Sequence, residues 1–323
     1  MRIAIVGAGA VGLGIGSGLL AAGHTVRFAT RTPEAADALL RDGVERSGLF
    51  GDVRIAPSRL EAGVGADALR GRAFEWMLVA TKTPDAPACA EALARAWHDI
   101  GGAKRVVLAY NGWGAAEPFE RALGARGAAL YAARVITGFQ RRSATRVEVT
   151  AHAAPVLVGP LGDAPPAPAA DFCEAVASGG IPCEPCDDVE RELWAKLLYN
   201  CALNPLGALI GVPYGALGAD ARTRAILEAV VAEIFALLDA RGTRLAWPGA
   251  RAYLEHFFRD LLPPTAAHES SMLQDLRAGR RTEIDALCGA VVRLAGELGL
   301  DAPVNRALWQ LVRAREERRA RMH

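Results

Sequence analysis

The sequence predicts an α/β protein, with a parallel-sheet domain at residues 1–186 and an all-helical domain at residues 187–323. Three observations predict this class. A buried-strand pattern at residues 3–6 runs into a glycine-rich turn and a helix of small residues. Apolar runs and helical patterns then alternate, as they do in proteins with parallel sheets. After Asp187, nearly every segment has the helical period of about 3.6 residues.

The turn after the first strand has the spacing G-x-G-x-x-G. Its first glycine permits a tight turn, its second lets the backbone approach a pyrophosphate, and its third allows close packing of helix on strand. Because phosphates favour a helix N-terminus, we predict a Rossmann-type dinucleotide site here. The residues expected to line it are Gly7, Ala8, Gly9, Ala10, Val11 and Gly12. The alternative is a glycine-rich turn that binds no ligand.

The end of the second strand, predicted at residues 25–29, indicates which dinucleotide is bound. An acidic residue there would accept a hydrogen bond from the ribose 2′-hydroxyl of NAD, but no carboxylate occurs before Glu34. Arg31 stands there instead, and its guanidinium is suited to a 2′-phosphate. The sequence therefore favours NADPH, and the alternative is an arginine on an exposed loop.

Two further strands deliver polar loops to the carboxyl edge of the sheet, where ligands of such folds bind. The strand at residues 74–80 leads to Lys82, and a helix at residues 85–98 returns the chain. The strand at residues 106–109 leads to Asn111. We expect both side chains near the nicotinamide end, although the dipeptide Asn111-Gly112 also favours a simple turn.

The remaining elements follow from shorter patterns. Three runs that alternate apolar and polar residues, at 131–135, 145–149 and 155–158, predict antiparallel additions to the sheet. A helix at 169–177 and a strand at 181–183 complete the domain. The helical domain is predicted to contain segments 188–210, 219–241, 248–260, 270–278, 283–298 and one from 303. The segment after Thr282 carries one apolar face that ends at Leu298.

One helix of the second domain carries an unusual polar stripe. Lys196, Asn200 and Asn204 are spaced four residues apart, whereas the rest of the segment is apolar on most sides. A helix of this kind is expected to be buried, so the amine and the two carboxamides need partners inside the protein. The stripe predicts a lined pocket. The alternative is a half-exposed helix whose Lys196 reaches water.

Composition excludes several classes of protein. The net charge is +1, and the arginines at 313–321 are interrupted by glutamates, as on a solvated helix end, so we expect no nucleic-acid partner. No apolar run reaches the roughly 18 residues of a membrane span or the pattern of a signal peptide, which favours a cytoplasmic protein without a membrane partner. The six cysteines fit reduced, buried thiols, and we assign neither Cys183 nor Cys186 to a metal site.

The motifs described above resemble those of the ketopantoate reductase (2-dehydropantoate 2-reductase) family, and the resemblance covers essentially the whole length of the chain. The resemblance implies a Rossmann domain followed by a helical domain like the C-terminal domain of 6-phosphogluconate dehydrogenase. It also implies a small 2-oxo acid as substrate, while a homodimer is compatible with the sequence. The motifs that carry it are the glycine turn 7–12, Lys82, Asn111-Gly112, residues 194–200 with 204–206, and residues 270–275 with 281–285.

The resemblance also implies roles for individual residues. Lys196 matches the general acid, Asn200 and Asn204 match residues that hold the substrate, and Ser271 and Glu283 match residues that complete the site. The residues that match positions along NADPH are Arg31, Lys82 and Asn111.

These roles make chemical sense, although two of them have alternatives. An amine at Lys196 would stabilise negative charge on a reduced carbonyl oxygen and then donate the proton. Glu283 would orient Lys196 or a substrate hydroxyl, or else serve as a first-turn helix acid. Ser271 would contact the substrate, or else cap a helix together with Gln274.

Three positions near the expected substrate end depart from the family pattern. Tyr110 stands where a glutamine is common, and Tyr214 and His268 stand where asparagines are common. The resemblance predicts NADPH-dependent reduction of ketopantoate to pantoate, in pantothenate biosynthesis. The three departures motivate the first alternative, a paralogue that reduces another small 2-oxo acid or an imine. The second alternative is a catalytically silent NADPH-binding sensor.

Overall fold

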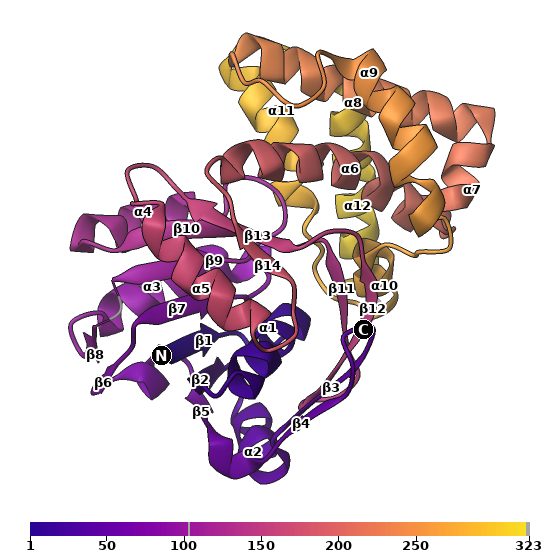
Figure 1. The fold of residues 1–323 in the computed structure, drawn as a ribbon. Helices are drawn as coiled ribbons and strands as arrows, with labels where there is room; N and C mark the ends of the chain where they lie inside the picture. Colours follow the sequence, from indigo (N-terminus) through magenta and orange to yellow (C-terminus); the bar gives the residue numbers. More distant parts are fainter. Residues whose placement is uncertain (103, 321–323) are drawn as a thin grey trace. The chain divides into compact units, whose positions relative to one another are not determined.

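The computed structural model describes residues 1–102 and 104–320, which form two compact units. The first unit contains residues Met1–Tyr110 and Ala115–Glu190, and the second contains Asn111–Gly114 together with the chain from Arg191 onward. Figure 1 shows strands concentrated in the first unit and helices in the second. The predicted class, a parallel α/β sheet followed by an all-helical region, is confirmed.

An eight-stranded sheet forms the centre of the first unit, in the order β14-β13-β10-β9-β7-β1-β2-β5 (Figure 1). All neighbouring strands are parallel except β10 and β13, which are antiparallel. The strands are β1 Arg2–Val6, β2 Thr25–Thr30, β5 Leu60–Val64, β7 Trp76–Val79, β9 Arg105–Leu108, β10 Ala129–Arg134, β13 Val156–Pro160 and β14 Cys183–Pro185. The helices of this unit are α1 Ala10–Ala21, α2 Pro33–Asp42, α3 Ala86–Ala96, α4 Glu117–Ala122 and α5 Ala167–Ala177.

The prediction of three antiparallel additions was right for only one strand. β10 extends the parallel sheet beside β9, and β13 then pairs antiparallel with β10. The predicted strand at 145–149 is β12 Arg146–His152, which belongs to a separate four-stranded sheet in the order β11-β12-β3-β4. The other strands of that sheet are β11 Thr137–Arg141, β3 Val44–Gly48 and β4 Val53–Ile55. A local alternation of residues predicts a strand but does not fix its partner.

Helix α1 lies between the two sheets, because it packs on β1 and β2 and also on β11, β12, β3 and β4. Its residues from Gly12 to Leu20 are all buried. Glycines allow this close fit: a Cβ at Gly16 would lie 2.7 Å from the Phe28 ring, and one at Gly14 would collide with the Phe139 ring. A helix of small residues is therefore what this position requires.

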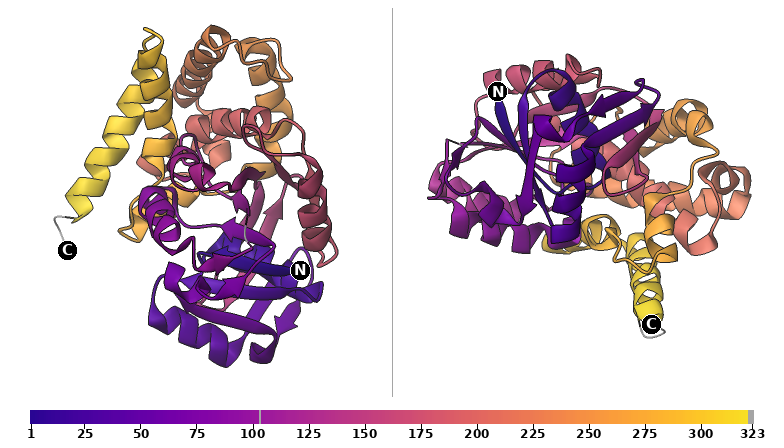
Figure 2. Two further views of the ribbon diagram at one scale, coloured as in Figure 1. Left: turned by 90° about the vertical axis from the view of Figure 1, so that its left-hand side faces the viewer. Right: turned by 90° about the horizontal axis from the view of Figure 1, so that it is seen from below.

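Helix α6 (Val189–Ile210) contributes the central part of the core of the second unit. The other helices are α7 Tyr214–Ala219, α8 Ala221–Ala240, α9 Ala250–His256, α10 Ser271–Arg277, α11 Cys288–Glu297 and α12 Pro303–Ala320. Figure 2 shows α12 as the long yellow helix that leads to the C-terminus. None of the helices in the described residues combines the length and apolarity of a membrane span.

Pro205 lies inside α6 and has no N–H to offer the carbonyl of Cys201 four residues earlier. The thiol of Cys288 lies 3.9 Å from that carbonyl oxygen and acts as a weak donor to it. Both cysteines are fully buried. The contact joins α6 to α11 and compensates in part for the missing helical hydrogen bond.

The predicted helix at 283–298 is broken, and this changes the setting of Glu283. A 3-10 turn covers Ile284–Ala286, Leu287 has an irregular backbone (φ −98°, ψ −107°), and α11 begins only at Cys288. Leu298, predicted on the apolar face, is 45% exposed because it lies just past the end of α11. Glu283 precedes the 3-10 turn, so its alternative interpretation as a first-turn acid of a long helix is wrong.

Candidate active site

Three polar side chains from separate segments of the second unit form a chain of hydrogen bonds. The Nζ of Lys196 donates to Oδ1 of Asn111 at 2.6 Å, and Nδ2 of Asn111 donates to Oε2 of Glu283 at 2.8 Å. Glu283 is 9% exposed, and the other two residues are half-buried. The family resemblance implied that Lys196 and Glu283 act on the substrate and that Asn111 lies along the cofactor. In the structure, all three side chains are linked by hydrogen bonds.

The loop Asn111–Gly114 is held by the segment that follows Glu283. The N–H of Trp113 donates to the carbonyl of Ala286 at 2.7 Å. The Trp113 ring also stacks on the ring of Trp194 in α6, with centroids 4.2 Å apart. Gly112 has φ +83°, and a Cβ there would lie 2.2 Å from the Ala286 carbonyl oxygen. Only glycine fits at this position, and the fit fixes Asn111 beside Glu283.

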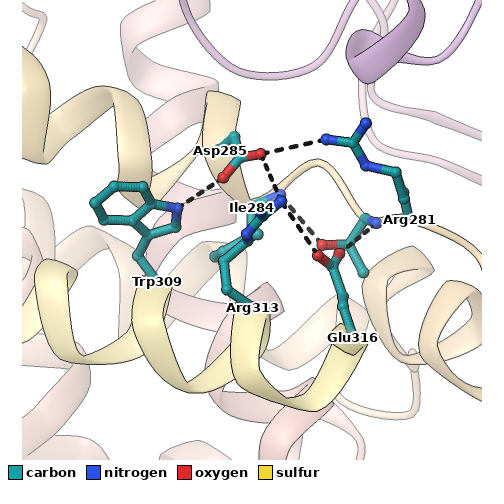
Figure 3. A network of polar contacts seen from close by, with 7 residues as sticks. Arg281, Ile284, Asp285, Trp309, Arg313 and Glu316 are labelled. Carbon is teal, nitrogen blue, oxygen red and sulfur yellow. Dashed lines mark hydrogen bonds and ion pairs between the residues drawn. The ribbon is translucent and has the colours of Figure 1, made fainter. Parts of the chain in front are cut away.

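Helix α12 holds the segment that carries Glu283. Figure 3 shows the polar contacts between this segment, at Arg281, Ile284 and Asp285, and the helix residues Trp309, Arg313 and Glu316. Oε1 of Glu316 accepts a hydrogen bond from the N–H of Thr282 at 2.6 Å. Asp285 accepts from Nε1 of Trp309 at 2.7 Å and pairs with Arg313 at 3.2 Å. The prediction that this arginine- and glutamate-rich tail is solvated surface was wrong for Glu316, whose side chain is only 10% exposed.

The two asparagines of the polar stripe lie on α6 as the helical period predicts. Asn200 is half-buried, and Asn204 is 7% exposed. The hydroxyl of Tyr214 donates to Oδ1 of Asn204 at 2.5 Å, and Oγ of Ser270 donates to the Asn204 carbonyl at 3.4 Å. Burial raises the pKa of the Tyr214 phenol well above its usual range, so the phenol keeps its proton. A narrow crevice beside the stripe is lined by Asn204, Ser271, Met272, Asp275, Glu283 and Leu287.

Ser270, not Ser271, caps helix α10. Oγ of Ser270 accepts from the N–H of Leu273 at 3.1 Å, and Ser270 is 1% exposed. The interpretation of Ser271 as the N-cap was therefore wrong, and Ser271 is the exposed first residue of the helix, on the rim of the crevice. Sequence reasoning missed Ser270 because two adjacent serines offer two equivalent caps.

The glycine turn in the first unit has open space beside Gly9. Gly7 has φ +103°, and a Cβ at Gly12 would lie 2.0 Å from the Gly7 carbonyl oxygen, so the fold itself requires both glycines. At Gly9, by contrast, the nearest atom to a Cβ would be the Ala80 oxygen at 3.8 Å. The bare backbone at Gly9 begins α1, whose first turn carries no acidic residue. This N-terminus therefore suits an anionic ligand.

Arg31 is exposed at the end of β2. The pKa of Arg141 on β11 is lowered, mainly by burial and also by the positive charge of Arg31. Sequence reasoning missed Arg141, since nothing local links β11 to the end of β2. Lys82 is exposed where the 3-10 turn Thr83–Asp85 begins.

The first residues after β7 and β9 contact each other within the first unit. Oγ1 of Thr81 lies 2.6 Å from the hydroxyl of Tyr110, which is 6% exposed. Cys89 of α3 joins this contact, and burial raises the pKa of its thiol to about 11. Tyr110 is thus fixed by Thr81 and Cys89 at the carboxyl edge of the sheet.

Comparisons with known proteins give a consistent result. The family model described as "Ketopantoate reductase PanE/ApbA" matches residues 3–163, and its C-terminal counterpart matches residues 188–316. A 2-dehydropantoate 2-reductase from Aquifex aeolicus is 30% identical over 98% of this chain and 97% of its own length. One from Halobacterium salinarum is 31% identical over 97% of this chain and 98% of its own length.

Solved structures show the same fold. A PanE/ApbA family ketopantoate reductase from Ralstonia eutropha superposes with a TM-score of 0.85 at 30% identity, covering 99% of this chain and all of the other. A D-mandelate dehydrogenase bound to NADH and anilino(oxo)acetate superposes with a TM-score of 0.84, over 99% of this chain and all of the other. Its identity is only 22%, so this second likeness concerns the fold alone.

Proposed function

The chain belongs to the ketopantoate reductase family, and from this premise we propose that it reduces 2-dehydropantoate (ketopantoate) to pantoate with NADPH, in pantothenate biosynthesis. The observation that carries the proposal is the chain of hydrogen bonds from Lys196 through Asn111 to Glu283. It places a primary amine, held by Asn111, on the same stripe of α6 as two carboxamides. A ketone reductase needs such a group to receive the oxygen of its substrate.

Lys196 is the proposed proton donor. As the keto group is reduced, negative charge grows on its oxygen, and the ammonium stabilises that charge and then transfers its proton to it. The neutral amine afterwards regains a proton from solvent. General acid catalysis of this type contributes about 10²- to 10⁴-fold in rate.

Asn111 and Glu283 orient the amine. An ionised carboxylate can only accept hydrogen bonds, so Glu283 binds the Nδ2 end of the Asn111 amide. The Oδ1 end of that amide therefore faces Lys196 and accepts from its amine. Glu283 therefore acts on Lys196 through Asn111 and also lines the crevice beside Asn204. Asn204 and Ser271 are the proposed substrate contacts of that crevice, and Asn200 is a third contact, one turn before Asn204 on α6.

The first unit is proposed to hold the nucleotide. Gly9 and the N-terminus of α1 suit the pyrophosphate, Arg31 suits a 2′-phosphate, and Lys82 is a further cation for the cofactor. When bound, NADPH supplies the hydride for the keto carbon. The positive charge of Arg141 near Arg31 favours NADPH over NADH, because the extra phosphate of NADPH relieves their repulsion.

Steady-state kinetics test this function. Purified protein is expected to oxidise NADPH with ketopantoate at a higher kcat/KM than with other small 2-oxo acids, and to use NADH poorly. Lys196→Ala should lower kcat by about 10²-fold or more while calorimetry shows nearly unchanged NADPH affinity. A better substrate among other 2-oxo acids or imines would favour the paralogue alternative, which Tyr110 and Tyr214 motivate. A Lys196→Ala variant with full turnover would exclude the proposed proton donor.

A further inference from the structure

The two ends of the Asn204 side-chain amide differ in their hydrogen bonding. Its Oδ1 accepts a hydrogen bond from the hydroxyl of Tyr214 at 2.5 Å. Within residues 1–102 and 104–320, its Nδ2 donates to no protein group. Asn204 lines the crevice that also contains Glu283 and Ser271. A buried amide of this kind presents donors, not an acceptor, to whatever enters the crevice.

Tyr214 is itself held rigidly, so it can impose an orientation on Asn204. Tyr214 is 4% exposed, and its backbone N–H donates to the carbonyl of His268 at 3.0 Å. Its ring packs edge-on against Tyr199, whose hydroxyl lies 2.6 Å from Oγ1 of Thr265. A phenol that stays protonated on such a fixed ring is a donor toward Asn204.

We propose that Tyr214 is a positioning residue that fixes Asn204 with its Nδ2 toward the crevice, so that the site selects a substrate oxygen that accepts a hydrogen bond. The inference rests on the proposed function, because it assumes that the crevice receives part of the substrate. A substrate that offered an ammonium or iminium N–H at this point would meet another donor. The arrangement therefore favours substrates that present a carboxylate, carbonyl or hydroxyl oxygen at this point over analogues that present an ammonium or iminium N–H there.

The first test is Tyr214→Phe, which keeps the ring and removes only the hydroxyl. The amide of Asn204 then loses its fixed orientation, and KM for ketopantoate is expected to rise about 3- to 10-fold, the range of one ordinary hydrogen bond, with kcat within about twofold. Tyr199→Phe is the matched control, since Tyr199 belongs to the same ring cluster but bonds to Thr265. Equal effects of the two variants, or an unchanged KM in Tyr214→Phe, would overturn the proposal.

The second test is Asn204→Asp, which keeps an acceptor for Tyr214 but replaces the donor that faces the crevice. KM for ketopantoate is expected to rise about 100-fold or more, because a carboxylate would face the substrate oxygen beside Glu283. In an Asn204→Ala background, Tyr214→Phe should have no further effect on KM. Normal substrate binding by Asn204→Asp, or additive effects on KM in the double variant, would contradict the orientation.

A measurement without substrate separates this proposal from the proposed function. If the wild-type protein reduces no 2-oxo acid, the function fails, but the contact can still be measured by thermal unfolding. The Tm losses of Tyr214→Phe and Asn204→Ala are expected to be non-additive, because both remove the same hydrogen bond. Fully additive losses would show that Tyr214 does not hold Asn204.

Discussion

The carboxylate of Glu316 offers the sharpest test of how Glu283 is held. Glu316→Ala removes the acceptor of the Thr282 N–H, a 2.6 Å hydrogen bond to a side chain that is 10% exposed. A hydrogen bond to a charged group contributes about 1.5–3 kcal/mol. The additional contact with Arg313 at 3.7 Å is partly exposed and adds at most about 0.5 kcal/mol after solvent screening. The free energy of unfolding should therefore fall by about 2–3 kcal/mol.

The same change should affect turnover, because Thr282 directly precedes Glu283. Releasing the Thr282 N–H loosens the segment that carries Glu283, and with it the chain to Asn111 and Lys196. A displacement of about 1 Å in such a chain can lower the rate about 10²-fold, so we expect kcat to fall about 10- to 100-fold. Urea unfolding gives the stability, and steady-state kinetics with ketopantoate and NADPH give kcat and KM.

Two further variants control the experiment. Glu317→Ala makes the same change one residue later on the exposed side of α12, and should leave both stability and kcat nearly unchanged. Glu316→Gln keeps a neutral acceptor for the Thr282 N–H and should lose about half as much stability as Glu316→Ala. The reasoning is refuted if Glu316→Ala matches Glu317→Ala in stability, or if it unfolds more easily while kcat remains at the wild-type value.

Three other variants probe the nucleotide site and the helical core. Arg31→Ala should raise KM for NADPH about 10- to 100-fold and leave KM for NADH nearly unchanged, and an equal loss for both cofactors would contradict a role at the 2′-phosphate. Gly12→Ala places a Cβ 2.0 Å from the Gly7 carbonyl oxygen and must displace the glycine turn. Calorimetry should therefore detect no nucleotide binding, and normal affinity would show that the turn tolerates a side chain. Tyr253→Phe removes a fully buried hydroxyl that has no hydrogen-bond partner in the described residues, so the free energy of unfolding should stay the same or rise by about 1 kcal/mol. Chemical unfolding that showed a loss of more than about 1 kcal/mol would indicate a partner for this phenol.

The sequence was sufficient for the parts of the fold that depend on neighbouring residues. The glycine turn, the buried strands on either side of β1 and the helical period of α6 are all local signals. The second sheet was missed because β3 has the sequence VERSG, with no clean alternation, and its partner β12 lies about a hundred residues away. The break at Leu287 was missed because an apolar period continues through it.

The residues of the candidate site also fall into those that a local pattern reveals and those that it does not. The stripe of Lys196, Asn200 and Asn204 could be read from one helix, but its partners could not. Asn111 is 85 residues from Lys196 in the chain, and Glu283 is 172 residues from Asn111. The family resemblance supplied those residues, yet it gave no indication that Asn111 lies between the amine and the carboxylate. Glu316 was missed because its sequence surroundings are those of a solvated helix end.

The position of Tyr214 explains how a departure from the family pattern can alter substrate choice without altering the chemistry. Lys196 and Asn204 lie about two turns apart on α6, and each is oriented by a different partner. Asn111 fixes the amine, whereas Tyr214 fixes the carboxamide. Under the orientation proposed above, a substitution that removes the Tyr214 hydroxyl releases the Asn204 amide and leaves the bond from Lys196 to Asn111 in place. Substitution at this residue is then expected to alter which substrate is accepted, while the proposed proton donor, Lys196, keeps its partner Asn111.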